Sequence, residues 1–253
     1  MPNTLVIQSH RSPLPYRWIQ RCLDSVRDWC AMRGYEYHFT GDELFDCLPA
    51  SIAAKTQLQT VIATDLARLL TLKEALNRGY ETVVWMDADF LIFDPSRFSL
   101  PDQSYAVGRE VWVQHDRRRR LKSYKKIHNA FLMFLQGNSF LDFYADTAER
   151  LLRLNNGPVP PQFIGPKLLT ALHNVAGLPV LESAGMLSPM VIRDILAGEG
   201  PALDLFVQDS PQPIAAANLC VSSCDRDEVA DREMECLIDI MLANAGVRYR
   251  QHR

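Results

Sequence analysis

The chain has 253 residues, 47% of them hydrophobic and 23% charged, with a formal net charge of −3. This is the composition of an ordinary globular protein, long enough for one large α/β domain or two small ones. The near-neutral charge argues against general nucleic-acid binding. Six cysteines are too few for a disulfide scaffold in a chain of this size.

Targeting and metal-binding cysteine patterns are not evident. The segment Met1 to Gln8 lacks a basic stretch followed by a sustained apolar one, so no signal peptide is expected. No apolar run has the length needed to cross a bilayer, so no transmembrane segment is expected. Cys220 and Cys224 have no second pair, which argues against a zinc site. The default expectation is a cytoplasmic protein.

The chain opens with a strand, a helix and a second strand. Residues 4–9 are aliphatic and β-branched, and residues 35–39 alternate between apolar and polar. Between them, from Pro15 to Gly34, apolar residues recur at steps of three and four, with proline at the start and glycine at the end. This order predicts a parallel crossover unit.

The next segment contains the most informative pattern. Residues 51–78 read as helical in two pieces that end at Gly79. The following stretch, Val83–Phe93, is apolar except for Asp87 and Asp89, and reads as a buried strand. Because carboxylates are rarely buried unpaired, both should lie at the rim of the sheet. Side chains two apart on an extended segment point the same way, so the pair could face one divalent cation.

The second half of the chain gives weaker signals. Arg117–Arg120, followed by several lysines, predicts a mobile solvated loop, or alternatively a lid or acceptor-facing loop that meets phosphate or anionic lipid. The other expected elements are short strands at 104–107, 111–113 and 178–181, a buried strand at 129–134, an apolar stretch at 214–221, and helices at 140–154, 165–173 and 227–245.

Asp65 and Arg68 are spaced to lie on one face of the helix before the apolar strand. One interpretation is a surface ion pair, worth at most about 1 kcal/mol. The other is a polar pair at a ligand site, with Arg68 free to bind a phosphate or carboxylate as a fork.

Several ordered segments together resemble a known family. Ala63–Arg68, Gly79–Tyr80 and Val84–Asp89 look like the nucleotide-sugar core of GT-A glycosyltransferases with a D-x-D motif. The match is to the family 32-like group that contains Och1-like mannosyltransferases, capsular polysaccharide sugar transferases and clostridial glucosylating toxins. Asn129–Phe131, Gly137–Leu141 and Phe163–Thr170 are similar to later segments of that group, in the same order.

This resemblance implies an α/β, GT-A-like (Rossmann-like) fold with a mostly parallel central sheet flanked by helices. It implies a single domain, 1–253, with the nucleotide-sugar core at about 1–100 and an acceptor-side part at about 101–253. The implied enzyme is a hexosyltransferase of bacterial polysaccharide biosynthesis. It would move a sugar from a nucleotide-diphosphate donor, with UDP favoured over GDP, to a hydroxyl of a glycan, lipid-linked or other acceptor. The anomeric configuration would be retained.

The resemblance also implies roles for individual residues. Asp89 would ligate Mn²⁺ or Mg²⁺, and Asp87 would bind the donor ribose or sugar, or the metal through water. Asp65 and Arg68 would hold the hydroxyls of the donor sugar and help position its phosphates. Breaking a sugar–phosphate bond leaves negative charge on the diphosphate, which a cation and an arginine stabilise well.

The remaining candidates match the family less closely. Ser9 and His10, at the end of the first strand, could contact the nucleotide, although a lone histidine is commonly structural. Asn129 and Gly165 could line the sugar or acceptor pocket, or simply begin a strand and a helix. Asn218 stands where the group has a metal-ligating histidine, and the tryptophan that usually follows is missing. Asn218 could still ligate through its carbonyl oxygen.

Two other classes of protein remain open. A haloacid-dehalogenase-type phosphatase also has a D-x-D motif, but there the motif follows the first strand, whereas here it follows at least two. A non-catalytic sugar-binding relative is the third possibility, although the intact acidic and arginine residues argue against it.

Overall fold

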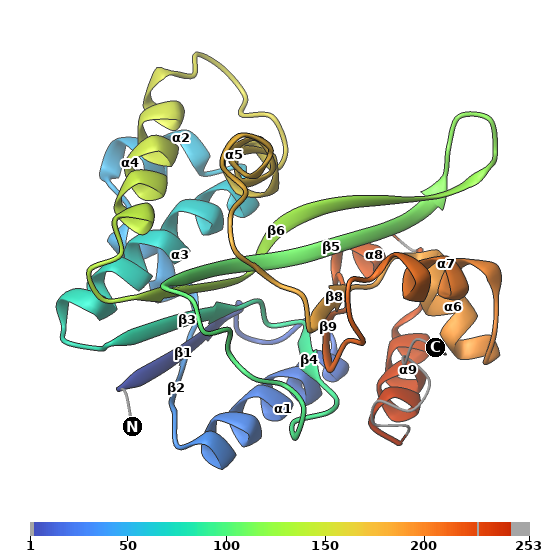
Figure 1. The fold of residues 1–253 in the computed structure, drawn as a ribbon. Helices are drawn as coiled ribbons and strands as arrows, with labels where there is room; N and C mark the ends of the chain where they lie inside the picture. The colour runs from blue at the N-terminus through green and yellow to red at the C-terminus, as the bar shows by residue number, and fades with distance from the viewer. Residues whose placement is uncertain (1–2, 227, 244–253) are drawn as a thin grey trace.

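A six-stranded sheet in the order β2-β1-β3-β6-β5-β7 crosses the molecule (Figure 1), which a computed structural model describes over residues 3–226 and 228–243. Parallel neighbours are β1 (Thr4–Ser9) with β2 (Glu36–Thr40) and with β3 (Thr82–Met86), and β5 (Tyr105–His115) with β7 (Val180–Leu181). β6 (Leu121–Leu135) is antiparallel to β3 and β5. The predicted α/β class with a mostly parallel sheet is confirmed.

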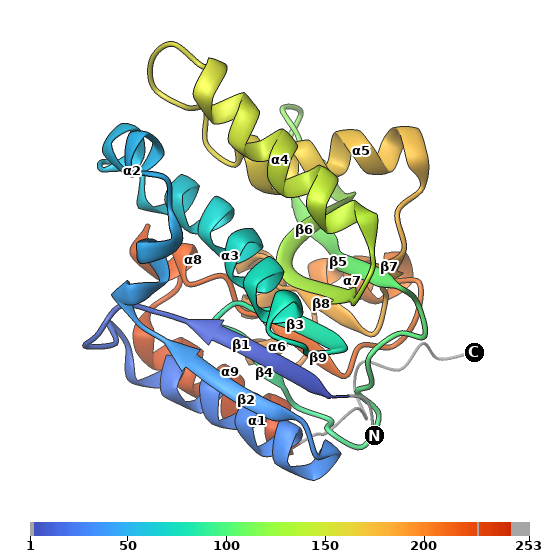
Figure 2. The same cartoon turned by 90° about the vertical axis from the view of Figure 1, so that its left-hand side faces the viewer.

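Helices cover both faces of this sheet, as Figure 2 shows. Helix α1 (Arg17–Arg33) joins β1 to β2 and lies on one face, so the predicted crossover unit is confirmed. Gly34 ends α1 in the left-handed conformation at φ 69°. Helices α3 (Thr60–Asn77) and α4 (Ser139–Leu154) lie on the opposite face.

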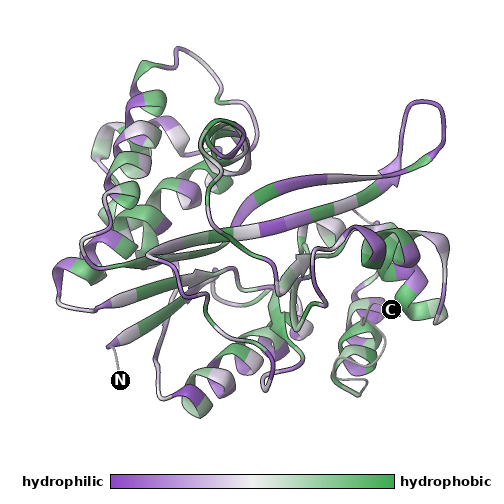
Figure 3. Cartoon of the chain, in the orientation of Figure 1, coloured by the Kyte–Doolittle hydropathy of each residue, from purple (hydrophilic) through white to green (hydrophobic). Residues whose placement is uncertain are grey.

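The strand sequences explain this layering. Successive side chains of a strand point to opposite faces. Ile7 and Trp85 accordingly pack with the residues of α3 and α4, whereas Val6 and Val84 pack with the residues of α1. Apolar residues therefore follow one another along the central strands, which appear as the green interior of Figure 3.

A second sheet, in the order β4-β9-β8, stands beside the first. Its strands are β4 (Phe90–Ile92), β9 (Ala216–Asn218) and β8 (Ala184–Met186). The predicted single strand Val83–Phe93 is therefore divided into β3 and β4. Asp87 to Asp89 form a turn between them, closed by a hydrogen bond of 3.0 Å from Phe90 N to Asp87 O. The expectation that the two carboxylates share an extended segment is wrong.

β5 and β6 form a long hairpin that projects from the main sheet (Figure 1). Residues 104–107 and 111–113, expected as two short strands, belong to the single strand β5. The expected basic loop is wrong from Leu121 onward, since those residues pair with β5. Only residues 116–120 make the turn. Asp116 Oδ1 fixes this turn by accepting from the backbone N–H groups of Arg118 and Arg120.

The other helical segments complete the fold. The helix expected at 165–173 is α5 (Leu168–Ala176), preceded without a break by one turn of π-helix, η2 (Phe163–Lys167), in which the backbone of Gly165 is non-helical. The predicted last helix runs from Asp231 to Ala243, and the outer ends of the 227–245 prediction lie outside the described residues. The remaining bounds are η1 (Asp42–Cys47), α2 (Ala50–Thr56), α5 (Leu168–Ala176), α6 (Pro189–Ala197), α7 (Pro201–Asp209) and α8 (Ser222–Asp225).

None of the helices in the described part of the chain combines the length and the apolar character that crossing a membrane requires.

Candidate active site

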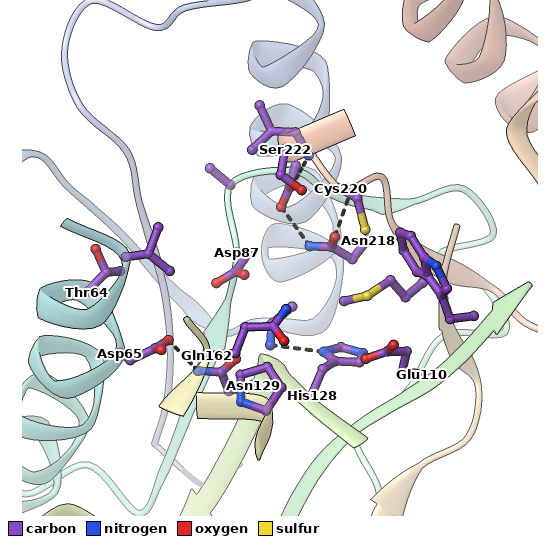
Figure 4. Close-up of a pocket in the computed structure, with 18 of the residues that line it drawn as sticks. Thr64, Asp65, Asp87, Glu110, His128, Asn129, Gln162, Asn218, Cys220 and Ser222 are labelled. Carbon is purple, nitrogen blue, oxygen red and sulfur yellow. Dashed lines mark hydrogen bonds between the residues drawn. The ribbon is translucent and has the colours of Figure 1, made fainter. Parts of the chain in front are cut away.

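A cleft of about 1330 Å³ opens where β1 and β3 end, beside the middle of β6. Figure 4 shows part of its lining. The cleft brings together every residue predicted for the site except Gly165, which lies just behind its wall. The predicted residues that line the cleft are Ser9, His10, Asp65, Arg68, Asp87, Asp89, Asn129 and Asn218.

Strand register explains why residues so far apart in sequence meet here. β6 runs antiparallel to β3, with Met86 opposite Phe131, so the residues before Phe131 extend past the end of β3. Asp87 N donates to Ala130 O at 2.9 Å, which continues this pairing by one residue. In the second sheet Phe90 is opposite Asn218, which sets Asn218 beside Asp89.

Asp65 and Arg68 form a buried network with Asn129. Their relative exposures are only 2% and 5%, so the surface ion pair interpretation is wrong. Asn129 Nδ2 donates to Asp65 Oδ1 at 2.7 Å, and Arg68 Nη1 donates to the carbonyl of Asn129 at 2.6 Å. Arg68 Nη2 lies 3.5 Å from Asp65 Oδ1. These bonds fix α3 against β6 at the edge of the cleft.

Arg68 also connects this network to the Asp87–Asp89 turn. Its Nη1 lies 3.1 Å from Asp87 Oδ1, and its guanidinium stands 5.1 Å from the centre of the Trp85 ring. Trp85 Nε1 donates to the same Asp87 oxygen at 2.7 Å. The side chain of Asp87 is 29% exposed, and it points into the space between Asp65 and Asn218 in Figure 4. Asp87 is therefore held by one oxygen and faces the cleft.

One oxygen of Asp65 is buried without a partner. Among the described residues nothing donates to Asp65 Oδ2, although the atom is inaccessible to solvent. Burial raises the pKa of Asp65 to about 6, against the opposing effect of Arg68. A Cβ placed on Gly165 would lie 2.6 Å from this oxygen and 2.8 Å from Asn129 Nδ2. Gly165 thus lets the chain approach the network closely.

Replacing Gly165 with alanine should disturb this network. The added methyl overlaps two short buried side chains, and overpacking of this kind typically costs about 1–3 kcal/mol. Urea unfolding would measure the loss. Gly41→Ala is the matched control, because its Cβ would meet only the end of the exposed Glu43 side chain, at 2.8 Å. Equal stability losses for the two variants would contradict the steric explanation.

The raised pKa of Asp65 predicts a pH-dependent stability difference. Its folded-state pKa of about 6 exceeds the ordinary 3.8, so the folded protein binds this proton more tightly than the unfolded chain does. The resulting stability is fully present below about pH 4 and is lost as the pH rises through about 6. Relative to wild type, Asp65→Asn should therefore gain up to about 3 kcal/mol between pH 4 and pH 7.5. Urea unfolding of both proteins at the two pH values, in metal-free buffer, would measure this difference. A stability difference that is the same at both pH values would mean that folding does not raise the pKa of Asp65, and would contradict the prediction.

Asp89 is bonded through both oxygens. Asn218 Nδ2 donates to Oδ1 and the Val221 backbone N–H donates to Oδ2, each at 2.7 Å. Burial, followed by repulsion from Asp87, raises the pKa of Asp89 to about 6. Asn218 accepts from Cys220 N at 2.9 Å through its own carbonyl oxygen. Asn218 therefore orients Asp89, while its expected role as a direct metal ligand stays a prediction.

The donor atoms at the turn suit a hard divalent cation. Within the described ranges no three His, Cys, Asp or Glu side chains gather into a ready-made metal centre. Mg²⁺ and similar ions commonly need only one or two carboxylates, with waters and substrate phosphates completing the shell. Asp87 and Asp89 supply such a pair. Their mutual repulsion, expressed in the raised pKa of Asp89, would be relieved by a bound cation.

The sequence did not identify several residues of the cleft. His128 lies behind Asn129, accepts from Ala130 N at 3.0 Å through Nδ1, and contacts Arg109 O at 3.0 Å through Nε2. Burial lowers its pKa to about 4, so it is a neutral structural residue. Gln162, Glu110 and the loop around Cys220 also line the cleft. The sequence offers a hint for only one of these residues: His128 is the direct neighbour of the predicted site residue Asn129.

No protein-family model matches the sequence, and no curated protein matches it. Several solved structures are similar. One is a glycosyltransferase involved in glycosylation of the major capsid of PBCV-1: 15% identity, TM-score 0.49, covering 92% of this chain and 99% of that one. Another is the galactosyltransferase LgtC in complex with donor and acceptor sugar analogues. It is 11% identical with a TM-score of 0.42, and the match covers 93% of this chain and 95% of that one. A third is the glycosyltransferase GlyE of Streptococcus pneumoniae. It is 8% identical with a TM-score of 0.41, and the match covers 98% of this chain and 62% of that one. Each of these three proteins is described as a glycosyltransferase.

Proposed function

We propose that the protein is a metal-dependent glycosyltransferase that moves a sugar from a nucleoside diphosphate sugar to a hydroxyl acceptor. The observation that carries this proposal is the meeting of two systems in one cleft. A carboxylate pair at the end of β3 lies directly against the buried network of Asp65, Arg68 and Asn129. The first suits a cation with a diphosphate, and the second suits a polyhydroxyl ligand.

The buried network supports the sugar part of the proposal. Buried polar atoms normally have hydrogen-bond partners, and Asp65 Oδ2 has none among the described residues. A sugar hydroxyl at this edge of the cleft would donate to it. Asn129 then acts by holding the carboxylate in place, and Gly165 by leaving room beside it.

The turn supports the diphosphate part. Asp89 and Asp87 would hold Mn²⁺ or Mg²⁺ together with the donor phosphates. When bound, such a cation would neutralise the charge that develops on the departing diphosphate. Arg68 adds a fixed positive charge next to Asp87, already oriented by Asn129 and Trp85. Groups oriented in advance stabilise developing charge without reorganising during the reaction.

Finer features of the activity follow the sequence resemblance and are proposed with it: a UDP-sugar donor rather than a GDP-sugar, and retention of the anomeric configuration. Contact of the nucleoside with Ser9 and His10, which line the cleft at the end of β1, is proposed as well. Retention would be tested by NMR of the product, where an inverted anomeric centre would overturn it. The cytoplasmic location also stays a prediction.

A thermal-shift panel tests the activity class. UDP-glucose, UDP-galactose and GDP-mannose would each be added with and without Mn²⁺. A ligand present at a hundred times its Kd stabilises the folded state by about 2.7 kcal/mol, so the melting temperature should rise clearly for a donor with Mn²⁺. No rise with any donor would contradict the proposal. Phosphate release from p-nitrophenyl phosphate would point to a phosphatase instead.

A further inference from the structure

The β5–β6 hairpin has two faces with different surroundings. In an antiparallel pair, residues directly opposite one another lie on the same face of the sheet. Glu110 is opposite Lys126, and Trp112 is opposite Tyr124. All four side chains line the cleft. We call these four residues the acceptor face.

The other face of the hairpin is fixed to the body of the protein. Val111 and Val113 are buried in the core formed with α6 and α7. Near the outer end, Lys125 Nζ lies 3.1 Å from Asp209 Oδ1, and Ser123 also bonds Asp209. Near the base, Arg109 Nε donates to Glu182 at 2.8 Å. The acceptor face is therefore a rigid wall of the cleft.

The aromatic side chains of this wall are only half-buried. The indole of Trp112 donates to Gln114 Oε1 at 3.2 Å, and the ring of Tyr124 stands across the hairpin from it. Within the described part of the chain, no other aromatic ring stacks on either. A pair of partly open rings inside a large cleft offers flat apolar surface with polar edges, which is typical of ligand-binding pockets.

Glu110 adds a hydrogen-bond acceptor next to the rings. No described residue donates a hydrogen bond to it, and the positive charge that acts on it is that of Lys126, its partner across the hairpin. Burial raises the pKa of this carboxyl. It faces the same space as the loop around Cys220, which follows Asn218 and Asp89 in the site (Figure 4).

The positions of these residues along the hairpin determine how far each lies from the proposed donor site. At about 3.3 Å per residue, Glu110 and Lys126 lie about 7 Å outward from the Gly108–His128 pair, and the two rings lie about 13 Å outward. His128 adjoins Asn129 of the proposed donor site. Glu110 is thus nearer the reacting end of the cleft, and the rings are further out.

We propose that the acceptor face binds the acceptor and that this acceptor is a carbohydrate. Its ring packs a C–H face on Trp112 and Tyr124, and Glu110 accepts a hydrogen bond from one of its hydroxyls. This inference rests on the proposed glycosyltransferase activity. In the transfer, the acceptor oxygen bonds the anomeric carbon and the bond from that carbon to the phosphate oxygen breaks. The diphosphate leaves with the electron pair and takes up the hydroxyl proton.

The test separates acceptor binding from donor chemistry. Two rates are measured with the donor that gives the largest thermal shift in Mn²⁺: hydrolysis without acceptor, and transfer to lactose, methyl α-mannoside or methyl β-glucoside. Glycerol and a serine-containing peptide serve as non-sugar hydroxyl acceptors. We expect Trp112→Ala and Tyr124→Ala each to raise the KM for the sugar acceptor about tenfold while hydrolysis stays at the wild-type rate.

Further variants distinguish recognition from misfolding. Trp112→Phe should restore most of the transfer, because it keeps a stacking surface. Glu110→Gln should reduce transfer but not hydrolysis. Phe143→Ala is the matched control, since this aromatic on α4 is 51% exposed and does not line the cleft.

Two results overturn different claims. Absence of donor hydrolysis by the wild-type protein would overturn the proposed activity itself. If donor hydrolysis is intact, the proposed activity stands, and either of two results would overturn the acceptor inference alone. In the first, Trp112→Ala and Tyr124→Ala transfer to sugars as well as the wild-type protein does. In the second, only glycerol or the peptide accepts the sugar.

Discussion

Replacing Asp89 with asparagine is expected to lower Mn²⁺-dependent donor hydrolysis by about 10²–10³-fold while the protein stays folded. The charge of Asp89 is buried beside Asp87, and its pKa is raised to about 6. Losing that charge weakens one of the two carboxylate ligands proposed for the cation. Losses of this order follow when one preorganised group that stabilises developing charge is removed.

The fold should survive this change. Asparagine keeps the shape of the side chain and can accept one of the two hydrogen bonds that now come from Asn218 and Val221. It also removes the repulsion with Asp87. Asp94→Asn is the matched control, because Asp94 is likewise buried and follows β4 but lies outside the cleft. Unchanged hydrolysis in Asp89→Asn, or an equal loss in Asp94→Asn, would contradict the role of Asp89.

The local periodicities of the chain were sufficient to predict the core of the fold. Strand β1, helix α1 and strand β2 follow directly from apolar patterns and from the breakers Pro15 and Gly34. The placement of Asp87 and Asp89 at the end of a buried strand followed from the cost of burying carboxylates. These features depend on neighbours in sequence, so one sequence contains enough information to find them.

Long-range contacts account for what the sequence did not reveal. Asp65 and Arg68 have the spacing of a surface pair, and only the arrival of Asn129 from β6 makes them a buried network. Glu110 and Trp112 look unremarkable until the register of the hairpin turns them toward the cleft. The paired residues after Leu121 read as a solvated loop because their charges conceal their strand pairing.

Replacing Arg68 with methionine is expected to destabilise the protein by about 3–5 kcal/mol. Methionine fills a similar volume but leaves Asp65 buried without its counter-charge, and removing one partner of a buried pair carries a cost of this size. Since Arg68 opposes the effect of burial, its loss should raise the pKa of Asp65 further above about 6. Urea unfolding of the metal-free protein at pH 7.5 would measure the change.

Two further variants decide whether the buried charge is the cause. Combining Arg68→Met with Asp65→Asn should recover part of the loss, because the second change removes the unpaired carboxylate. Arg21→Met removes an arginine that also makes two ion pairs, with Glu235 at 3.0 Å and Asp239 at 2.7 Å, but whose side chain is 32% exposed. It should cost only about 0–1 kcal/mol. If the double variant were no more stable than Arg68→Met, lost packing on Trp85 rather than charge would explain the effect, and the ligand-binding role of Asp65 would lose its electrostatic support.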